Sequence, residues 1–196
     1  MQAGILLLAA GGSSRMGTPK QLLPWRGTTL VRHAALQACG VADAAVYVVT
    51  GAHAPAVLAQ LDGLEISVVD HPDYRDGLGS SLAAGVGHII RSGGRDYTHL
   101  LVQLADQPAV DTAYLRLLLH QAAGDTRIIA SAYGDRAGVP AVFPARYFDA
   151  LSRLGADAGA GSLLKRHAAD VRLIHPPVPL FDIDTPEDYR RHEGNT

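Results

Sequence analysis

The chain has 196 residues, of which 47% are hydrophobic and 18% charged, with a formal net charge of −2 at pH 7. This length suits one domain with one sizeable core, and the composition is that of a globular protein rather than a disordered one. The sequence contains no basic run and no apolar stretch long enough to span a bilayer. We therefore expect neither nucleic acid nor a membrane as a partner.

Apolar runs and helical patterns alternate along the chain, and the runs end in glycine or polar residues. The predicted strands are Gly4–Ala9, Ala44–Thr50, Leu64–Val69, His99–Leu104, Arg127–Tyr133 and Val139–Phe143. The predicted helices are Thr28–Cys39, Ala54–Leu61, Ser80–Ile90, Asp111–Ala122, Arg146–Leu154 and Ser162–Ala169. Near-continuous apolar strands separated by helices predict a mostly parallel sheet covered on both faces. The expected fold is an α/β, single-domain, Rossmann-like three-layer αβα sandwich spanning 1–196.

The chain has one cysteine, Cys39, which excludes an intramolecular disulfide and a CxxC metal site. The N-terminus lacks the pattern of a signal peptide. Together these features predict a reducing, cytoplasmic setting. The nine histidines show no HExxH or other tight ligand spacing, so no zinc site is predicted.

A glycine-rich loop follows the first predicted strand, where a parallel sheet binds its ligands. It does not match the dinucleotide fingerprint, because Gly11 and Gly12 are adjacent and the next glycine is Gly17. It does not match the P-loop either, because Thr18-Pro19 stands where Lys-Ser or Lys-Thr should follow Gly17. The loop therefore belongs to neither of the two common phosphate-binding classes.

The chemistry of this loop still favours phosphate. Glycines let backbone N–H groups approach an anion closely, and Ser13 and Ser14 add donors. Arg15 can bridge phosphate oxygens with two hydrogen bonds, whereas Lys20 supplies a point charge. The alternative interpretation is an ordinary tight turn with solvated charges.

Three further segments carry polar groups. Asp106 directly follows a predicted strand and is either a Mg²⁺ ligand or a helix cap, although Asp111 and Thr112 lie nearer the helix start. In "DIDTPEDY", Asp182 and Asp184 would share one side of an extended segment and Ile183 the other, before a helix start at Thr185-Pro186. In "GLGSSL", Ser80 and Ser81 could read a nucleobase edge or simply cap a helix.

The string Leu8 to Gly17 (LAAGGSSRMG), followed by PKQLL, resembles the signature of the MobA-like nucleotidyltransferases. The similarity continues in DGLGSSLAAGV, QLADQP, GVPAVF and DIDTPEDY, and so covers nearly the whole chain. The LAAGG opening and Pro19 before Lys20 favour the molybdenum cofactor cytidylyltransferases over the guanylyl branch. Methylerythritol cytidylyltransferases share much of this pattern and are the nearest alternative.

This resemblance implies the fold of the nucleotide-diphospho-sugar transferases, with a nucleotide-binding half at about 1–110 and an acceptor-binding half at about 111–196. It implies transfer of CMP from CTP to molybdopterin cofactor with release of pyrophosphate, and Mg²⁺ as cofactor. A molybdoenzyme or its maturation chaperone is the implied partner. The alternatives are a related enzyme with another base or acceptor, a non-catalytic nucleotide-binding regulator, and a Rossmann dehydrogenase, which the failed fingerprint disfavours.

The resemblance also implies a set of site residues. The catalytic residues are Arg15, Lys20 and Asp106, and the metal ligands are Asp106 and Asp182, with Asp184 a weaker candidate. The nucleotide-binding residues are Ala9, Ala10, Gly11, Gly12, Ser13, Ser14, Arg15, Lys20, Gly79, Ser80 and Ser81. One departure concerns the acceptor: the family often has Gly-Asp-x-Gly-Ala-Arg where this chain reads Ala156-Asp157-Ala158-Gly159-Ala160-Gly161, without the arginine.

Overall fold

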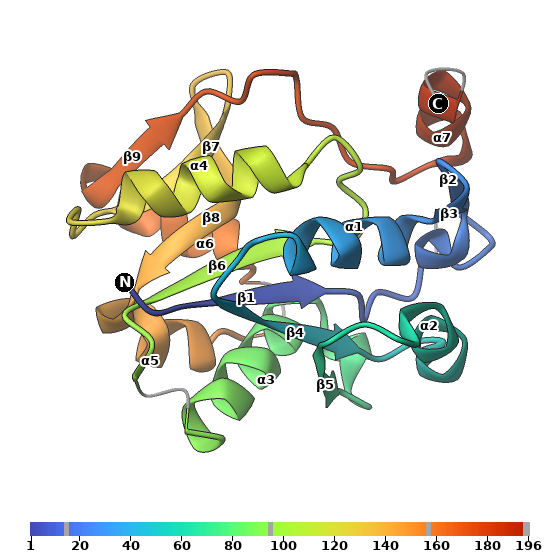
Figure 1. Ribbon diagram of the computed structural model, residues 1–196, viewed down its shortest axis with the longest axis horizontal. Coiled ribbons are helices and arrows are strands. Elements are labelled where there is room, and N and C mark those ends of the chain that lie inside the picture. Colours follow the sequence, from blue (N-terminus) through green and yellow to red (C-terminus); the bar gives the residue numbers. More distant parts are fainter. Residues whose placement is uncertain (14–15, 94–95, 156–157, 194–196) are drawn as a thin grey trace.

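The computed structural model describes residues 1–13, 16–93, 96–155 and 158–193. Its main element is a seven-stranded sheet with the strand order β5-β4-β1-β6-β8-β7-β9 (Figure 1). The strands are β1 Ala3–Leu8, β4 Ala44–Thr50, β5 Ser67–Asp70, β6 His99–Leu104, β7 Ile128–Tyr133, β8 Arg136–Pro144 and β9 Val171–Ile174. The helices are α1 Leu30–Cys39, α2 Ala54–Leu61, α3 Leu78–Arg91, α4 Thr112–Ala122, α5 Phe148–Ser152, α6 Ala160–Arg166 and α7 Pro186–Glu193.

The sheet is mostly parallel, as predicted. β1 pairs in parallel with β4 and β6, β4 pairs in parallel with β5, and β7 with β9. β8 is the exception, because it runs antiparallel to both β6 and β7. The carboxyl ends of β1, β4 and β6 therefore lie at one edge of the sheet, where the loops after them can meet.

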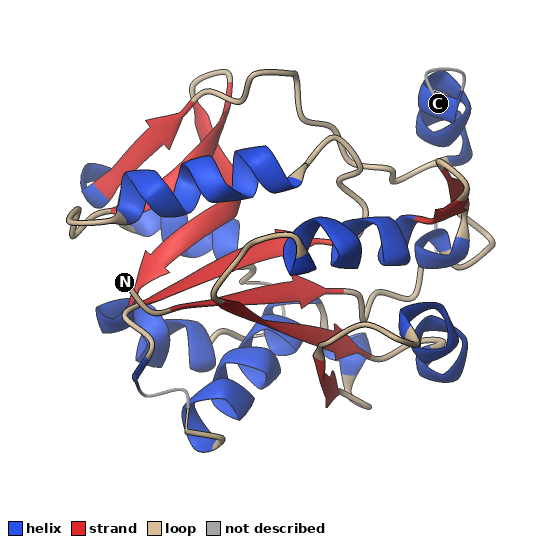
Figure 2. Ribbon diagram, viewed as in Figure 1, coloured by secondary structure: helices blue, strands red, loops and turns tan. Residues whose placement is uncertain are grey.

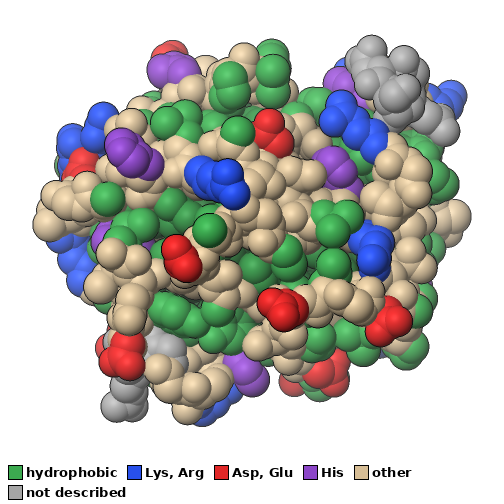
Figure 3. All heavy atoms as spheres, viewed as in Figure 1, with side chains coloured by type: hydrophobic (Ala, Val, Ile, Leu, Met, Phe, Trp, Pro, Cys, Tyr) green, Lys and Arg blue, Asp and Glu red, His purple; other side chains and the backbone are tan. Residues whose placement is uncertain are grey.

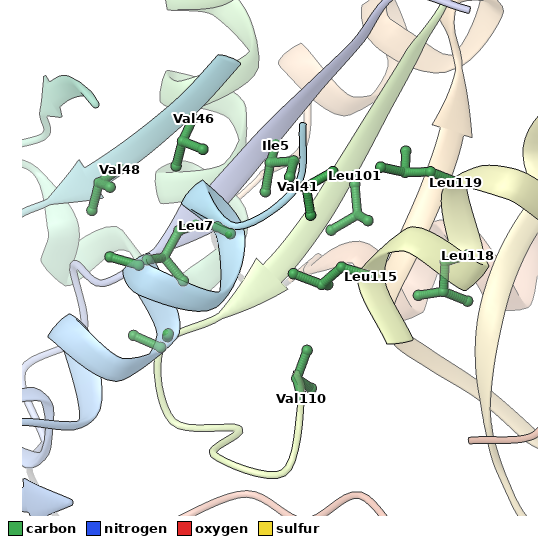
Figure 4. Packing of buried hydrophobic residues seen from close by; sticks show 14 of the residues in the cluster. Ile5, Leu7, Val41, Val46, Val48, Leu101, Val110, Leu115, Leu118 and Leu119 are labelled. Carbon is green, nitrogen blue, oxygen red and sulfur yellow. The ribbon is translucent and has the colours of Figure 1, made fainter. Parts of the chain in front are cut away.

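Helices cover both faces of the sheet, which gives the three layers of an αβα sandwich (Figure 2). One face packs against α1, α2 and α4, where Ile5 and Leu101 from the sheet meet Leu115 and Leu118 (Figure 4). The other face packs against α3, α5 and α6. The strands are buried from both sides, which explains why their sequences are continuously apolar rather than alternating.

Several predicted elements differ from the observed ones. The strand predicted at Leu64–Val69 begins at Ser67, and the one predicted at Val139–Phe143 is the longer β8, Arg136–Pro144. The helices predicted at Arg146–Leu154 and Ser162–Ala169 are the shorter α5 and the earlier α6. β9 was not predicted, because it is a short edge strand whose pairing with β7 is not encoded in a local pattern.

The chain's C-terminal part returns to the start of the fold. A two-stranded sheet, β2 Pro24–Trp25 and β3 Thr28–Thr29, follows the glycine-rich loop. The α7 residue Tyr189 donates a hydrogen bond from its hydroxyl to the Pro24 carbonyl at 2.8 Å. Helix α7 begins at Pro186, as predicted, and Thr185 and Asp188 exchange hydrogen bonds across its first turn. This return brings the DIDTPEDY segment beside the first loop.

The surface facing the viewer in Figure 3 mixes acidic and basic side chains rather than gathering one sign in a patch. None of the helices in the described part of the chain combines the length and apolar character that crossing a membrane requires.

Candidate active site

A pocket of about 420 Å³ opens at the carboxyl ends of β1 and β6. Its walls come from the glycine-rich loop, the turn before α3, the loop after β6 and the C-terminal DIDTPEDY segment. The lining residues are Leu8, Ala9, Ala10, Gly11, Gly12, Lys20, Gln21, Tyr74, Gly77, Leu78, Ser81, Leu104, Ala105, Asp106, Asp182 and Asp184. The parallel strands thus place four separate segments around one cavity, at the edge where open α/β sheets bind ligands.

The glycine-rich loop is organised by one buried glutamine. Gln21 is 3% exposed and donates from Nε2 to the carbonyl oxygens of Ala9 and Gly11. Its Oε1 accepts from the Ser13 hydroxyl at 3.0 Å, and that hydroxyl oxygen accepts from the Lys20 backbone N–H at 2.9 Å. Ser13 has φ 54°, in the left-handed region, which turns the loop back toward Lys20.

The predicted loop residues divide into three groups. Ala9, Ala10, Gly11, Gly12 and Lys20 line the pocket. Ser13 is held by Gln21 and supports the loop from within. Ser14 and Arg15 lie outside the described residues, so their predicted phosphate contacts stay predictions.

Lys20 lies between two carboxylates. Its Nζ donates to Asp106 Oδ2 and, at 2.9 Å, to Asp184 Oδ1. The side chains of Lys20 and Asp106 are only 16% and 14% exposed. Burial works to lower the pKa of Lys20, but the two carboxylates outweigh it and raise the pKa above its ordinary value. Lys20 is therefore a fixed positive charge at neutral pH.

The side chains of the Asp182-Ile183-Asp184 segment alternate between core and pocket, as predicted. Ile183 is fully buried with Trp25 and Leu30, whereas Asp182 and Asp184 both line the pocket. The Ile183 backbone N–H donates to the Asp106 carbonyl at 2.9 Å, which fixes the segment against the loop after β6.

The surroundings of Asp182 disfavour the ionised form of its carboxylate. Loss of surrounding water raises its pKa most, and the negative charges of Asp106 and Asp184 raise it further. A hydrogen bond from Gln107 and the charge of Lys20 lower it, but the net pKa lies above the ordinary value. A cation beside this carboxylate would stabilise the ionised form and lower the pKa.

The residues present fit a divalent cation. Asp106 Oδ1 is buried and has no hydrogen-bond partner among the described residues. Asp111, not Asp106, caps α4, since its carboxylate accepts from the Tyr114 N–H at 2.7 Å. The described residues contain no cluster of three or more His, Cys, Asp or Glu able to hold a metal alone. Two carboxylates with an orphaned oxygen suit a hard cation that completes its shell with substrate phosphate oxygens.

The three predicted residues of the GLGSSL segment have different surroundings. Ser81 is buried and lines the pocket. The Ser80 hydroxyl instead donates to the Gly77 carbonyl at 2.8 Å and lies 3.0 Å from His71 Nε2. A Cβ on Gly79 would lie 2.0 Å from the Gly155 carbonyl oxygen, so the close approach at Gly79 is to the protein's own backbone.

Sequence reasoning missed several residues in or beside the pocket. Tyr74 and Leu78 line the cavity beside Ser81, and Leu78 is 50% exposed there. Gln21 and Gln107 are both buried polar side chains next to the charged groups. The signal that could have found the two glutamines is their position in the sequence, because each directly follows a predicted site residue, Lys20 or Asp106. A polar amide buried at such a position is expected to have hydrogen-bond partners in the site.

A protein-family comparison matches residues 5–171 to the MobA-like NTP transferase domain. Nicotine blue oxidoreductase of Paenarthrobacter nicotinovorans is 37% identical over 198 residues, covering 95% of this chain and 94% of that protein. The Mycobacterium tuberculosis protein Rv0371c is 33% identical, with a TM-score of 0.78 and 97% of both chains covered. A further structure of Rv0371c, 28% identical over the full length of both chains and with a TM-score of 0.79, is a complex with manganese.

A more distant structure shares the fold alone. CMP:2-keto-3-deoxy-manno-octonic acid synthetase, solved with CTP, is 14% identical with a TM-score of 0.76, covering 100% of this chain and 98% of that one. The sandwich is therefore the single-domain nucleotide-sugar transferase-like fold. With the family match spanning most of the sequence, the chain belongs to the MobA-like NTP transferase domain family and is a nucleotidyltransferase.

Proposed function

We propose that the protein transfers CMP from CTP to molybdopterin cofactor and releases pyrophosphate. The observation that carries this proposal is the position of Lys20, Asp106 and Asp182 in one pocket beside the glycine-rich loop. Residues 1–110 would supply most of the nucleotide site, and residues 111–196 the acceptor site. The proposed setting is the cytoplasm, and a molybdoenzyme or its maturation chaperone would receive the product.

In the proposed reaction, an oxygen of the pterin's terminal phosphate attacks the α-phosphorus of CTP in line. A new P–O bond forms, the bond between the α-phosphorus and the bridging oxygen breaks, and pyrophosphate leaves with that electron pair. The attacking oxygen is already ionised at neutral pH, so no general base is needed. Catalysis then consists of positioning and of neutralising the negative charge that develops.

The chain's own residues have separate tasks in this scheme. The backbone of Gly11 and Gly12 borders the triphosphate, and Lys20 neutralises charge on the leaving pyrophosphate. Tyr74 and Leu78 form an apolar wall for the base, and Ser81 offers a hydroxyl to its edge. Asp106 and Asp182 would hold Mg²⁺, which supplies additional neutralisation of the phosphate oxygens when it is bound.

A pyrophosphate-release assay with each of the four ribonucleoside triphosphates, with and without molybdopterin cofactor, tests this function. We expect release with CTP and Mg²⁺ only when the pterin is present. Discrimination against GTP should be large, because a purine would leave polar groups of a pyrimidine site unpaired. Faster turnover of GTP would move the chain to guanylyl transfer, and nucleotide binding without reaction on the pterin would point to another acceptor.

A second candidate function rests on the relative named nicotine blue oxidoreductase, which aligns with 95% of this chain. The altered Ala156–Gly161 stretch leaves the acceptor side open to a different small molecule, although Ala156 and Asp157 lie outside the described residues. The test is loss of nicotine blue absorbance with an added electron donor and no nucleoside triphosphate. Turnover there, without pyrophosphate release in the first assay, would favour this candidate.

A further inference from the structure

Gln107 lies at the centre of a buried polar cluster beside the pocket. It directly follows Asp106 and is 3% exposed. Its Nε2 lies within hydrogen-bond distance of three acceptors: Asp182 Oδ1 at 2.9 Å, the Tyr133 hydroxyl at 2.9 Å and the Val139 carbonyl at 3.1 Å. Its Oε1 is buried without a partner among the described residues. The Nε2 group therefore has three nearby acceptors for its two hydrogens. The Oε1 atom, in contrast, accepts no hydrogen bond from the described residues.

This arrangement joins two parts of the chain that are distant in sequence. Tyr133 ends β7, Val139 lies in β8, and the Tyr133 hydroxyl donates to the Val139 carbonyl at 2.7 Å. Asp182 comes from a C-terminal segment without regular secondary structure. Gln107 connects the β7–β8 hairpin to the carboxylate of this irregular segment.

Asp182 needs such a connection more than Asp106 does. The described residues provide it with one hydrogen-bond donor, Gln107. Two further carboxylates, Asp106 and Asp184, line the same pocket and repel it. A carboxylate without a fixed partner would rotate away from this negative charge, whereas the hydrogen bond to Oδ1 holds it facing the pocket and does not use Oδ2.

We propose that Gln107 is a positioning residue, which orients the Asp182 carboxylate as a ligand for a divalent cation. This inference rests on the proposed role of Asp182 in holding that cation. It adds that cation affinity depends on a buried amide that does not itself touch the metal. Partners of this kind, which orient the ligands of a metal, change its affinity by about 10- to 100-fold when they are removed.

The chain contains a matched control. Gln103, on β6, is 1% exposed and donates from Nε2 to the Ala34 carbonyl at 3.3 Å. It is as buried as Gln107 and lies shortly before it in the chain, but its partner is a backbone carbonyl of α1 rather than a carboxylate. Replacing Gln103 by Met therefore measures what the loss of a buried amide does to the protein in general.

The experiment is a titration of the full chain with Mn²⁺ alone, in which free Mn²⁺ is measured by electron paramagnetic resonance. We expect Gln107→Met to raise the Mn²⁺ dissociation constant about 10- to 100-fold and Gln103→Met to leave it within about twofold. In an Asp182→Asn background, Gln107→Met should have little further effect, because the ligand it orients is already lost. Should Gln107→Met fold poorly in circular dichroism, Gln107→Asn, whose amide is one methylene too short to reach Asp182, replaces it.

Three results would overturn the inference: unchanged Mn²⁺ affinity in the Gln107 variant, equal weakening in Gln103→Met, or no Mn²⁺ binding by the parent protein. The titration contains no nucleotide, so it is independent of which base or acceptor the enzyme uses. Intact Mn²⁺ binding with the predicted loss in Gln107→Met, but no pyrophosphate release from CTP, would reject the proposed function and keep the role of Gln107.

Discussion

Lys20 illustrates how one side chain can serve both the folded structure and the proposed chemistry. Its Nζ is held by Asp106, 86 residues away in the sequence, and by Asp184, 164 residues away. The ion pairs keep the long side chain in the pocket and ionised, so little side-chain entropy would be lost when a phosphate binds. The same contacts join the first loop to the C-terminal segment.

We expect Lys20→Ala to lower turnover at least tenfold while the fold persists. A cation that faces developing phosphate charge supports the transition state, and each tenfold in rate is about 1.4 kcal/mol of that support. Lys165, the chain's other lysine, is exposed on α6 and is the matched control. Turnover of the Lys20 variant within about twofold of the parent would remove Lys20 from the catalytic residues.

Asp106→Asn should abolish metal-dependent turnover with little change in thermal stability. The substitution removes the ion pair to Lys20, but it also removes the cost of a buried charge with an unpartnered oxygen. Asp111→Asn is the control, because asparagine caps a helix about as well as aspartate. A much lower melting temperature with intact activity per folded molecule would make Asp106 a structural residue instead.

At the scale of elements, glycine positions reveal where backbone contact is tightest. Helix α3 crosses the sheet closely enough that a Cβ on Gly85 would lie 2.8 Å from Leu6 and Val49 side chains. At the start of the same helix, Gly79 contacts the backbone of Gly155 and Ala158. The helix that begins at the pocket therefore packs its own backbone closely on side chains of β1 and β4 and, at Gly79, on the backbone of the later loop.

Gly85→Ala should destabilise the protein by about 1–3 kcal/mol, because the added methyl overpacks the interface between α3 and the sheet. Gly161→Ala, in α6, meets nothing within 4 Å. It should stabilise by up to about 1 kcal/mol through helix propensity. Urea denaturation of both variants measures the difference. Equal stabilisation by the two substitutions would show that α3 moves away from the sheet at no cost.

At the scale of the whole molecule, a buried histidine couples stability to pH. His33 of α1 is 9% exposed, and its Nε2 lies 3.2 Å from the Pro108 carbonyl. Burial lowers the pKa of His33 more than that hydrogen bond raises it, and Arg26 lowers it further. Burial lowers the pKa of His99 as well.

The sign of the effect follows from proton binding. As the pH falls through about 6.5, the unfolded chain protonates its histidines before the folded protein does. The stability due to a neutral His33 is thus fully present above that pH and is lost progressively below it. We expect the melting temperature to fall between about pH 7.5 and 5.5, and His33→Gln to reduce that fall, whereas His120→Gln at an exposed site should not. An unchanged fall in His33→Gln would assign the acid sensitivity to other groups.

Local patterns in the sequence predicted the alternation of strands and helices, the mostly parallel sheet, the glycine-rich loop after β1 and Asp106 after β6. These features follow from local patterns, because apolar periodicity and the residues that end an element are encoded within a few neighbours. The charge pattern of the loop pointed to Lys20, and the family resemblance added Asp182 as a metal ligand; both residues line the pocket.

Which of these groups meet depends on the fold as a whole. The antiparallel direction of β8, the bracketing of Lys20 by two carboxylates and the packing of Gly79 on Gly155 depend on strand order and on contacts across the fold. The amide of Gln107 reaches Asp182, 75 residues later, because the C-terminal segment returns to the end of β6. No local pattern encodes such a contact, since its free energy comes from side chains that are adjacent only after the sheet has formed.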